Sequence, residues 1–154
     1  MNIVLFEPEI PQNTGNISRT CVVTGTRLHL IEPMGFSVSD KQVKRAGLDY
    51  WSLLDLEVHR DFPSFEEKYG NHPFYFLSTK GEKRYDEIEF EEDAFLIFGK
   101  ESAGFPSYIH EKYAPQRFRI PMIPNEKARS LNLSNSVGIV LYEALRQQGF
   151  HDLV

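Results

Sequence analysis

Three segments rich in glycine, proline and short polar side chains each follow an apolar run that predicts a buried strand. Residues 8–19, PEIPQNTGNISR, follow the run at 2–6, and residues 98–106, FGKESAGFP, follow the run at 95–98. Residues 120–135 follow a third short strand and lead into the last helix. In a parallel sheet the carboxyl ends of the strands share one edge, where ligands bind. We therefore expect the three segments to converge on one pocket.

The first segment offers a cation, and the third offers a cluster of hydrogen-bonding groups. Arg19 is suited to a phosphate or a developing oxyanion, although its spacing is equally typical of a surface arginine. Gly15 permits a close approach to the backbone. The start of the last helix holds more short polar side chains than a cap needs, so the excess can bind a polar ligand at the positive helix end: Ser130, Asn132, Ser134 and Asn135.

Several well-known catalytic and binding motifs are missing. Gly99 and Gly104 have the G-x-x-x-x-G frame of a phosphate loop, but Phe105 and Pro106 follow in place of Lys and Ser/Thr. This segment can form the wall of a pocket, and an ordinary glycine turn explains its sequence equally well. Neither G-x-G-x-x-G nor G-x-S-x-G occurs. The five histidines are scattered without ligand spacing, so we expect no metal site: His29, His59, His72, His110 and His151. Cys21 is expected to be a small buried filler.

The pattern of apolar residues predicts the elements that must position these segments. Strands are expected at 2–6, 28–31, 51–58, 74–77, 95–98 and 118–120. Helices are expected at 13–24, 61–69, 106–113 and 133–147, with a further short one after Ser39 and Asp40. The first helix would be capped by Asn13, Thr14 or Asn16. Apolar strands that alternate with helices favour an α/β fold: a mostly parallel sheet with helices on both faces.

Composition and charge limit the class of protein. The chain has 154 residues, is 41% hydrophobic and 25% charged, and so predicts a single globular domain over 1–154. No signal peptide or membrane span is evident, and the single cysteine favours the cytoplasm. The net charge of −5 argues weakly against nucleic acid. Much of it sits in residues 61–95, with 10 acidic and 4 basic side chains, so a local basic surface for RNA stays compatible with the sequence.

The three segments, in this order, closely resemble the signature motifs of the SPOUT (SpoU-type) RNA 2′-O-methyltransferases. The matching stretches are PQNTGNISR, FGKESAGFP and IPMIP followed by SLNLSNSV. The run at 30–36 and the run at 45–50 are most similar to the minimal, single-domain members, which methylate the wobble nucleotide of tRNA, cytidine 34 or modified uridine 34. One departure is visible, because the stretch 125–129 is about two residues longer than the family pattern.

The resemblance implies a fold, a cofactor and an assembly. The family fold is an α/β domain with a deep C-terminal trefoil knot, a rare feature in proteins. The family needs no metal; its methyl donor is S-adenosylmethionine, and members act on tRNA as homodimers whose sites are completed across the interface. By match to the motifs, the residues that bind the methyl donor are Leu77, Ser78, Thr79, Gly99, Lys100, Glu101, Gly104, Ile120, Met122, Ser130, Leu131 and Asn132.

The resemblance also implies catalytic roles. Arg19, from the partner subunit, is the expected catalytic residue, with Asn132 and Ser134 as hydrogen-bonding partners. An arginine stays protonated, so Arg19 is better suited to stabilising the 2′-alkoxide or clamping a phosphate than to acting as a base. For RNA contact we expect Lys41, Lys44 and Arg45. For the dimer interface we expect the last helix, through Val137, Gly138, Leu141 and Tyr142.

Three alternatives stay open at this point. The chain can be a catalytically idle RNA-binding or nucleotide-sensing module with the same fold. It can be a flavodoxin-like enzyme of small molecules, although no cofactor motif supports that. Within the methyltransferase interpretation, the target can be another tRNA position or a ribosomal RNA site.

Overall fold

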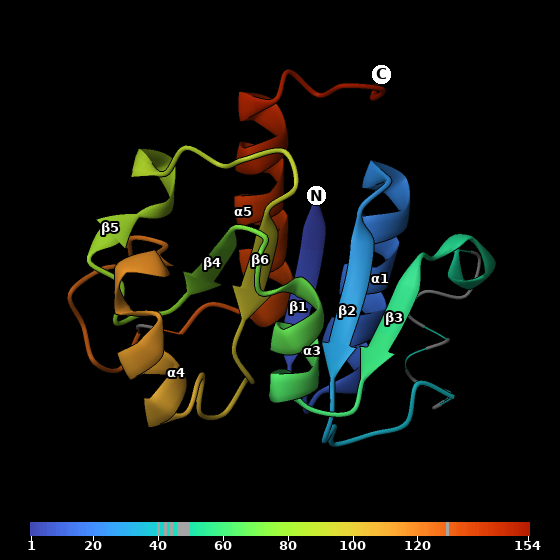
Figure 1. Ribbon diagram of the computed structural model, residues 1–154, viewed down its shortest axis with the longest axis horizontal. Coiled ribbons are helices and arrows are strands. Elements are labelled where there is room, and N and C mark those ends of the chain that lie inside the picture. The colour runs from blue at the N-terminus through green and yellow to red at the C-terminus, as the bar shows by residue number, and fades with distance from the viewer. Residues whose placement is uncertain (40, 42, 44, 46–49, 129) are drawn as a thin grey trace.

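The computed structural model describes residues 1–39, 41, 43, 45, 50–128 and 130–154 (Figure 1). Its centre is one seven-stranded sheet in the order β3-β2-β1-β6-β4-β7-β5. All strand pairings of this sheet are parallel. The strands are β1 Asn2–Phe6, β2 Arg27–Ile31, β3 Leu56–His59, β4 Phe74–Leu77, β5 Lys83–Arg84, β6 Phe95–Phe98 and β7 Arg117–Arg119. The predicted parallel sheet is confirmed.

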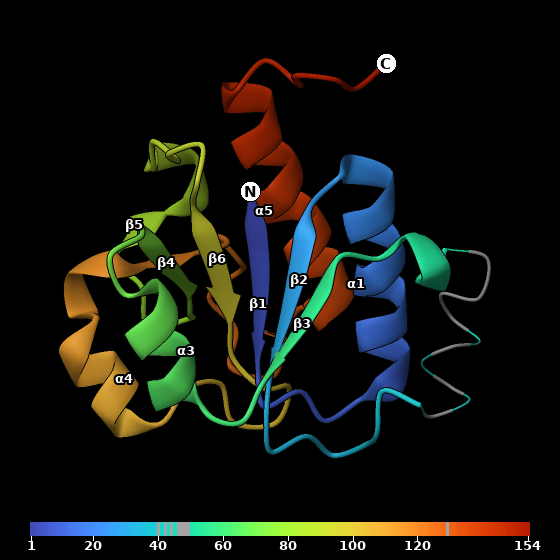
Figure 2. The ribbon, with the colours of Figure 1, turned by 45° about the vertical axis from the view of Figure 1, so that its right-hand side comes forward.

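Helices cover both faces of the sheet, as predicted (Figure 2). They are α1 Pro11–Thr24, α3 Phe62–Tyr69, α4 Ser107–Lys112 and α5 Leu133–Gln147. Alternate residues of a strand point to opposite faces. Ile3 therefore packs under α1 and α5, whereas Val4 packs under α3 and α4. The second face is built largely of aromatic rings, with Phe65 stacked on Phe74 at a centroid distance of 5.3 Å.

Several predicted elements appear with their expected bounds or within two residues of them. The strands at 74–77 and 95–98 and the helix at 133–147 are confirmed without change. Asp61 caps α3 by accepting a hydrogen bond from the Ser64 amide at 2.8 Å. Gly25 ends α1 in the left-handed conformation at φ 64°. Cys21 is buried, and burial raises the pKa of its thiol to about 12, which confirms it as a structural filler.

Other sequence-based predictions were wrong. Helix α1 begins at Pro11, a residue favoured in the first turn, so Asn13, Thr14 and Asn16 lie inside the helix and do not cap it. The N-cap residue is Ile10, whose apolar side chain cannot accept a hydrogen bond. The predicted strand at 51–58 is a 3-10 turn, Trp51–Leu53, followed by β3. The two-residue strand β5 was not predicted, since so short a run has no periodicity.

Because the sheet is parallel, the carboxyl ends of its strands lie along one edge. Two close contacts of the backbone shape the loops at this edge. The Ser78 amide, just beyond β4, donates to the Phe118 carbonyl oxygen of β7 at 2.9 Å. Three residues further on, Gly81 lies against β7 so closely that a Cβ atom there would be 2.4 Å from the Phe118 carbonyl carbon. The loop after β4 therefore wraps over the strand that leads to the third motif. Among the described helices, none is both long and apolar enough to cross a bilayer.

Candidate active site

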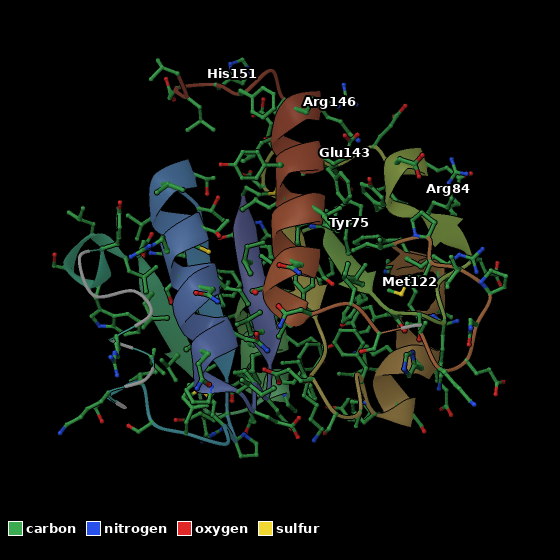
Figure 3. The ribbon with its side chains drawn as sticks, turned by 180° about the vertical axis from the view of Figure 1, so that it is seen from behind. Tyr75, Arg84, Met122, Glu143, Arg146 and His151 are labelled. Carbon is green, nitrogen blue, oxygen red and sulfur yellow. The ribbon has the colours of Figure 1, made fainter. Side chains whose placement is uncertain are left out.

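A cavity of about 500 Å³ lies at the carboxyl ends of β4, β6 and β7. All twelve residues that the resemblance implied for the methyl donor line it. They come from three separate segments: 77–79 at the end of β4 and just beyond it, 99–104 after β6, and 120–132 between β7 and α5. The long 120–132 segment carries Met122, which is partly exposed and is labelled in Figure 3. The predicted convergence of the motif segments on one pocket is confirmed.

Further lining residues were not predicted. They are Ile10, Asn13, Lys80, Phe98, Ala103, Phe105, His110, Leu133 and Ser136. Most are sequence neighbours of motif residues, so a prediction that includes the residues on either side of each motif contains them. His110 is different, because it lies on α4 and no pattern in the sequence marks it. Burial, with the nearby charges of Lys80 and Arg117, lowers the pKa of His110, so its imidazole is neutral at pH 7.

The wall contributed by the second motif is made of backbone. The Lys100 amide donates to the Gly104 carbonyl oxygen at 3.2 Å, and the Gly104 amide donates back to the Lys100 carbonyl oxygen at 2.8 Å. A Cβ atom on Gly99 would lie 2.6 Å from the Gly104 carbonyl carbon, and Gly104 has φ 64°. Both glycines are therefore required by this tight loop, which brings the backbone of the second motif close against itself beside the cavity.

The Glu101 carboxylate binds the backbone just before α1, a helix that has no side-chain cap. It accepts hydrogen bonds from the Glu9 amide at 2.8 Å, the Ile10 amide at 3.1 Å and the Asn13 Nδ2 at 3.3 Å. The first amide groups of a helix have no partners within it, and they favour a negative charge. Glu101 lines the cavity as predicted, but its two oxygen atoms also join the second motif to the first.

A reciprocal contact strengthens this junction. The Glu9 carboxylate accepts from the Ser102 amide at 2.9 Å and from Ser102 Oγ at 2.8 Å. These two bonds lower the pKa of Glu9, so it stays ionised. Beside it, the Lys100 ammonium donates to Glu7 Oε2 at 3.0 Å. We call the paired contacts of Glu9 with Ser102 and of Glu101 with the start of α1 the glutamate clasp.

The third motif is joined to the first by an asparagine pair. Asn132 donates from Nδ2 to Asn13 Oδ1 at 3.1 Å. Its Oδ1 caps α5 by accepting from the Ser134 amide at 2.9 Å and the Asn135 amide at 3.4 Å. Ser134 Oγ donates to the same oxygen at 2.6 Å and is not part of the cavity lining. Ser134 therefore acts in the helix cap in this chain.

The structure does not bring Arg19 to the cavity of its own chain. Arg19 is exposed on α1 and is not among the lining residues. Its guanidinium lies over the Tyr50 ring, 4.9 Å from the centroid, which holds it on the outer surface by a cation–π contact. Of the predicted RNA-binding residues, Lys41 and Arg45 are exposed, and Lys44 lies outside the described residues. Residues 125–128 of the longer loop are exposed and do not line the cavity.

Known proteins similar to this chain share its whole length. The model of the SpoU rRNA methylase family matches residues 1–142. A tRNA (cytidine(34)-2′-O)-methyltransferase of Methylovorus glucosotrophus is 49% identical over 150 residues, 97% of this chain and 96% of that protein. A solved structure described as giving insight into 2-OH methylation of C/U34 on tRNA has a TM-score of 0.90 and 42% identity, and covers 96% of this chain and 95% of its own.

A third similar protein is an rRNA methyltransferase of Sinorhizobium meliloti, solved with AdoMet bound. Its TM-score is 0.79 at 25% identity, over 94% of this chain and 55% of its own. The family match and the near-complete coverage at 49% identity agree with the three motif segments that meet around the cavity. The chain belongs to the SpoU rRNA methylase family.

Proposed function

We propose that this chain is an S-adenosylmethionine-dependent tRNA methyltransferase that methylates the ribose 2′-hydroxyl of the wobble nucleotide, cytidine 34 or modified uridine 34. The observation that carries the proposal is the single cavity enclosed by all three motif segments. Relatives named for this activity are similar over nearly the whole chain. We also propose that the enzyme works in the cytoplasm as one domain over 1–154.

The cavity suits a nucleoside-sized cofactor. Its volume lies in the usual range for small-molecule sites. Leu77, Ile120 and Leu131 provide apolar walls for a purine, and Ser78, Thr79 and Ser130 provide hydroxyl groups for polar parts of the ligand. The missing Cβ at Gly99 leaves room for this loop to fold tightly beside the ligand. When bound, S-adenosylmethionine supplies a methyl group on a sulfonium, and the ribose 2′-oxygen takes this methyl group with release of S-adenosylhomocysteine.

The chain must then position the ribose and stabilise its oxygen. Arg19 stays protonated and cannot be the base. It is suited to stabilising the developing 2′-alkoxide, while the proton leaves to water or to a phosphate oxygen. Since Arg19 faces outward in its own chain, we propose that it serves the cavity of a partner subunit. Lys41 and Arg45, which are exposed, are proposed to contact the RNA backbone.

The outer surface of α5 is the proposed dimer interface, but two of the four residues expected there are excluded. Val137 and Leu141 are fully buried in the core of their own chain and cannot contact a partner. Tyr142 is 46% exposed and Ile139 is 38% exposed. Gly138 directly precedes Ile139, and α1 packs beside α5. An added Cβ at Gly138 would meet nothing within 4 Å, which leaves room for a close approach by another chain. Glu143 and Arg146 form an ion pair further along the same helix (Figure 3).

We further propose that the chain is knotted, as in its family. The loop after β4 wraps over β7 through Ser78 and Gly81. The segment after β7 then runs back to Asn13 on α1. These contacts support a C-terminal segment that passes through the preceding loop.

The proposed activity predicts a defined product. Purified protein incubated with unmodified tRNA and S-adenosylmethionine should add one methyl group to the ribose of nucleotide 34, as mapped by mass spectrometry of nuclease fragments. The control is the same tRNA with a 2′-deoxy nucleotide at position 34, which should gain nothing. Binding of tRNA without any methylation would identify a non-catalytic RNA-binding protein, and a methyl group elsewhere would identify a different target.

Removing the Arg19 guanidinium should separate catalysis from binding of the methyl donor. We expect Arg19→Ala to lower the methylation rate by about 100-fold or more, the usual cost of losing one group that stabilises an oxyanion. The affinity for S-adenosylmethionine, measured by calorimetry, should stay unchanged because Arg19 does not line the cavity. Arg60→Ala, at another exposed arginine, is the control. Near-normal turnover of Arg19→Ala would remove Arg19 from the mechanism.

The position of Gly138 predicts opposite effects on the helix and on the dimer. Gly138→Leu should stabilise α5 by up to about 1 kcal/mol, because glycine is a poor helix former and the site is open within the chain. The same leucine should obstruct a partner and shift the sedimentation profile from dimer to monomer. Glu111→Leu, on the exposed surface of α4, adds a leucine on the other face of the sheet and should leave the dimer intact. A Gly138→Leu protein that stays dimeric would exclude this interface.

A further inference from the structure

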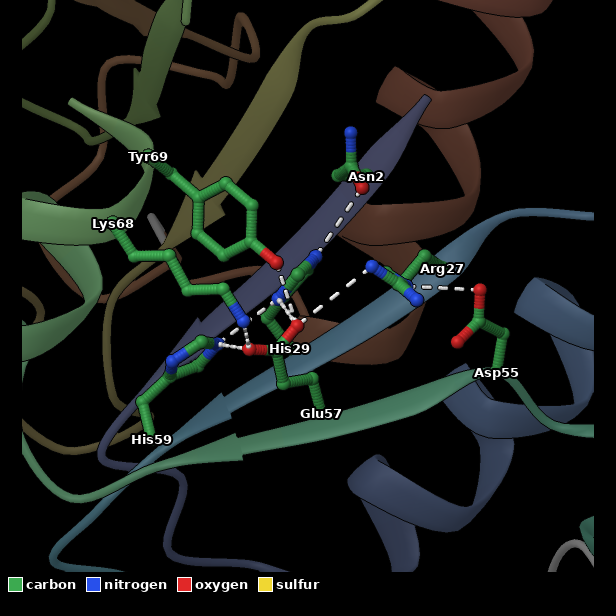
Figure 4. A network of polar contacts seen from close by, with 8 residues as sticks. All are labelled: Asn2, Arg27, His29, Asp55, Glu57, His59, Lys68 and Tyr69. Atoms are coloured by element: carbon green, nitrogen blue, oxygen red, sulfur yellow. Dashed lines mark hydrogen bonds and ion pairs between the residues drawn. The ribbon is translucent and has the colours of Figure 1, made fainter. Parts of the chain in front are cut away.

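A cluster of two histidines and a glutamate lies away from the cavity, at the β2–β3 edge of the sheet (Figure 4). His29 on β2 is fully buried, and His59 on β3 is 6% exposed. Glu57, also on β3, is three-quarters buried. None of the three lines the cavity. The proposed methylation makes no use of them, so their arrangement needs its own explanation.

Sheet pairing brings these residues together although they are far apart in sequence. In the parallel register His29 faces Glu57, and Ile31 faces His59. Glu57 and His59 are two residues apart on one strand and so share one face of the sheet. His29 shares that face, where Tyr69 of α3 packs edge-on against its ring at 5.2 Å. The spacing of the histidines in the sequence predicted no such cluster.

A hydrogen bond between His29 Nε2 and Asn2 fixes the orientation of the His29 ring. Asn2 Oδ1 lies 3.2 Å from His29 Nε2, and an amide oxygen can only accept, so the proton of the neutral ring resides on Nε2. The lone pair of Nδ1 therefore points at His59 Nε2, 3.0 Å away. Histidines that bind metals are usually held in this way, with the outer ring nitrogen donating to an oxygen.

Three ligand atoms surround one point. His29 Nδ1 and His59 Nε2 are 3.0 Å apart, and each lies 3.9 Å from a different oxygen of the Glu57 carboxylate. All three side chains offer ligand atoms within 4.8 Å of one another. In a tetrahedral zinc centre, with ligands about 2.0–2.2 Å from the metal, ligand atoms are about 3.3–3.6 Å apart. Small side-chain adjustments therefore bring these atoms to coordination distance.

The protonation states also suit a cation. Burial lowers the pKa of His29 to about 4 and lowers the pKa of His59 as well, so both rings are neutral at pH 7. Burial alone would raise the pKa of Glu57, but hydrogen bonds from Lys68 and Tyr69 outweigh it and lower this pKa to about 2. Two imidazoles and one carboxylate are a common zinc-binding set.

The charges that face the cluster leave room for a dication. Glu57 is paired with the Lys68 ammonium and accepts from Tyr69 Oη at 2.6 Å. Lys68 is 57% exposed, so its ammonium can move into solvent at little cost. Arg27 approaches Glu57 to 3.7 Å, but its stronger contact is with Asp55 at 2.9 Å. A metal that displaces Lys68 therefore meets a carboxylate that keeps only the Tyr69 hydrogen bond and the more distant Arg27.

We propose that His29, His59 and Glu57 form a binding site for a transition-metal dication of the Zn²⁺ class. Imidazole ligands select such ions over Mg²⁺ and Ca²⁺. Binding moves the proton of the His59 ring from Nε2 to Nδ1, and water completes the coordination. The metal joins β2 to the edge strand β3 and stabilises this edge of the sheet. This site is independent of the proposed methylation, because it lies outside the cavity.

Calorimetry of the untagged protein with Co²⁺ and Zn²⁺ tests the site directly. We expect one equivalent to bind, with the visible ligand-field bands of tetrahedral Co²⁺. At a free metal concentration about 100-fold above Kd, the Tm should rise by about 5–10 °C. Mg²⁺ should give neither the absorption bands nor the shift in Tm. Absence of stoichiometric Co²⁺ binding in the folded wild-type protein would overturn the proposal.

Variants assign the metal to these residues. His59→Gln and Glu57→Gln should each abolish the Co²⁺ bands. Asn2→Ala removes only the hydrogen bond to His29 Nε2 and should weaken metal binding by about 10–100-fold. His151→Gln, at an exposed histidine near the C-terminus, is the matched control and should bind like the wild type. Circular dichroism verifies that each variant is folded. Unchanged Co²⁺ binding by folded Glu57→Gln and His59→Gln proteins would place the metal elsewhere and overturn the assignment.

Discussion

The glutamate clasp is the contact on which the geometry of the candidate active site depends. Helix α1 begins without a capping side chain of its own. The Glu9 and Ile10 amides, which precede the helix, donate to Glu101 in the loop after β6. Glu9 returns the contact through Ser102. A hydrogen bond to a charged group contributes about 1.5–3 kcal/mol. Opening the clasp would therefore loosen both the helix that carries Arg19 and the cavity wall.

The parallel sheet is what makes such a clasp possible. Strands β1 and β6 are neighbours, so the loops that follow them leave the sheet side by side. The third motif joins them only after the chain has passed β7, and it does so through Asn132 and Asn13. Two glycines remove the steric obstacles, since Gly81 lies against β7 and Gly99 lies against Gly104. Polar residues of the three motifs join the loops to one another through hydrogen bonds.

The sequence predicted the elements whose side chains have a clear periodicity, and missed contacts made across the sheet. Helix α5 has five buried residues at helical spacing, and β4 and β6 are unbroken apolar runs, so their bounds were confirmed. The start of α1 was predicted wrongly, because the helix begins at Pro11 without a side-chain cap, and the partner of the Ile10 amide is Glu101, 91 residues away. The pairing of His29 with His59 was missed for the same reason, since it depends on the register of β2 and β3.

The resemblance to a family supplied what periodicity could not. It identified the twelve lining residues before the cavity was known, whereas spacing alone left Arg19 and the two glycines with ordinary explanations. The roles of Ser134, Val137 and Leu141 needed the structure. Ser134 Oγ donates to Asn132 Oδ1, the atom that caps α5, and the two apolar residues face the core of their own chain.

The central claim is that the glutamate clasp shapes the cavity for the methyl donor, and Glu9 tests it most directly because its carboxylate belongs to the clasp and Glu9 does not line the cavity. The decisive measurement is calorimetric titration of S-adenosylmethionine into the wild type, Glu9→Ala and, as control, Glu92→Ala in the exposed acidic stretch. Our account predicts binding by the wild type and by Glu92→Ala, and an affinity about 10-fold weaker for Glu9→Ala. Equal affinities for the three folded proteins, or no binding by the wild type, would contradict it.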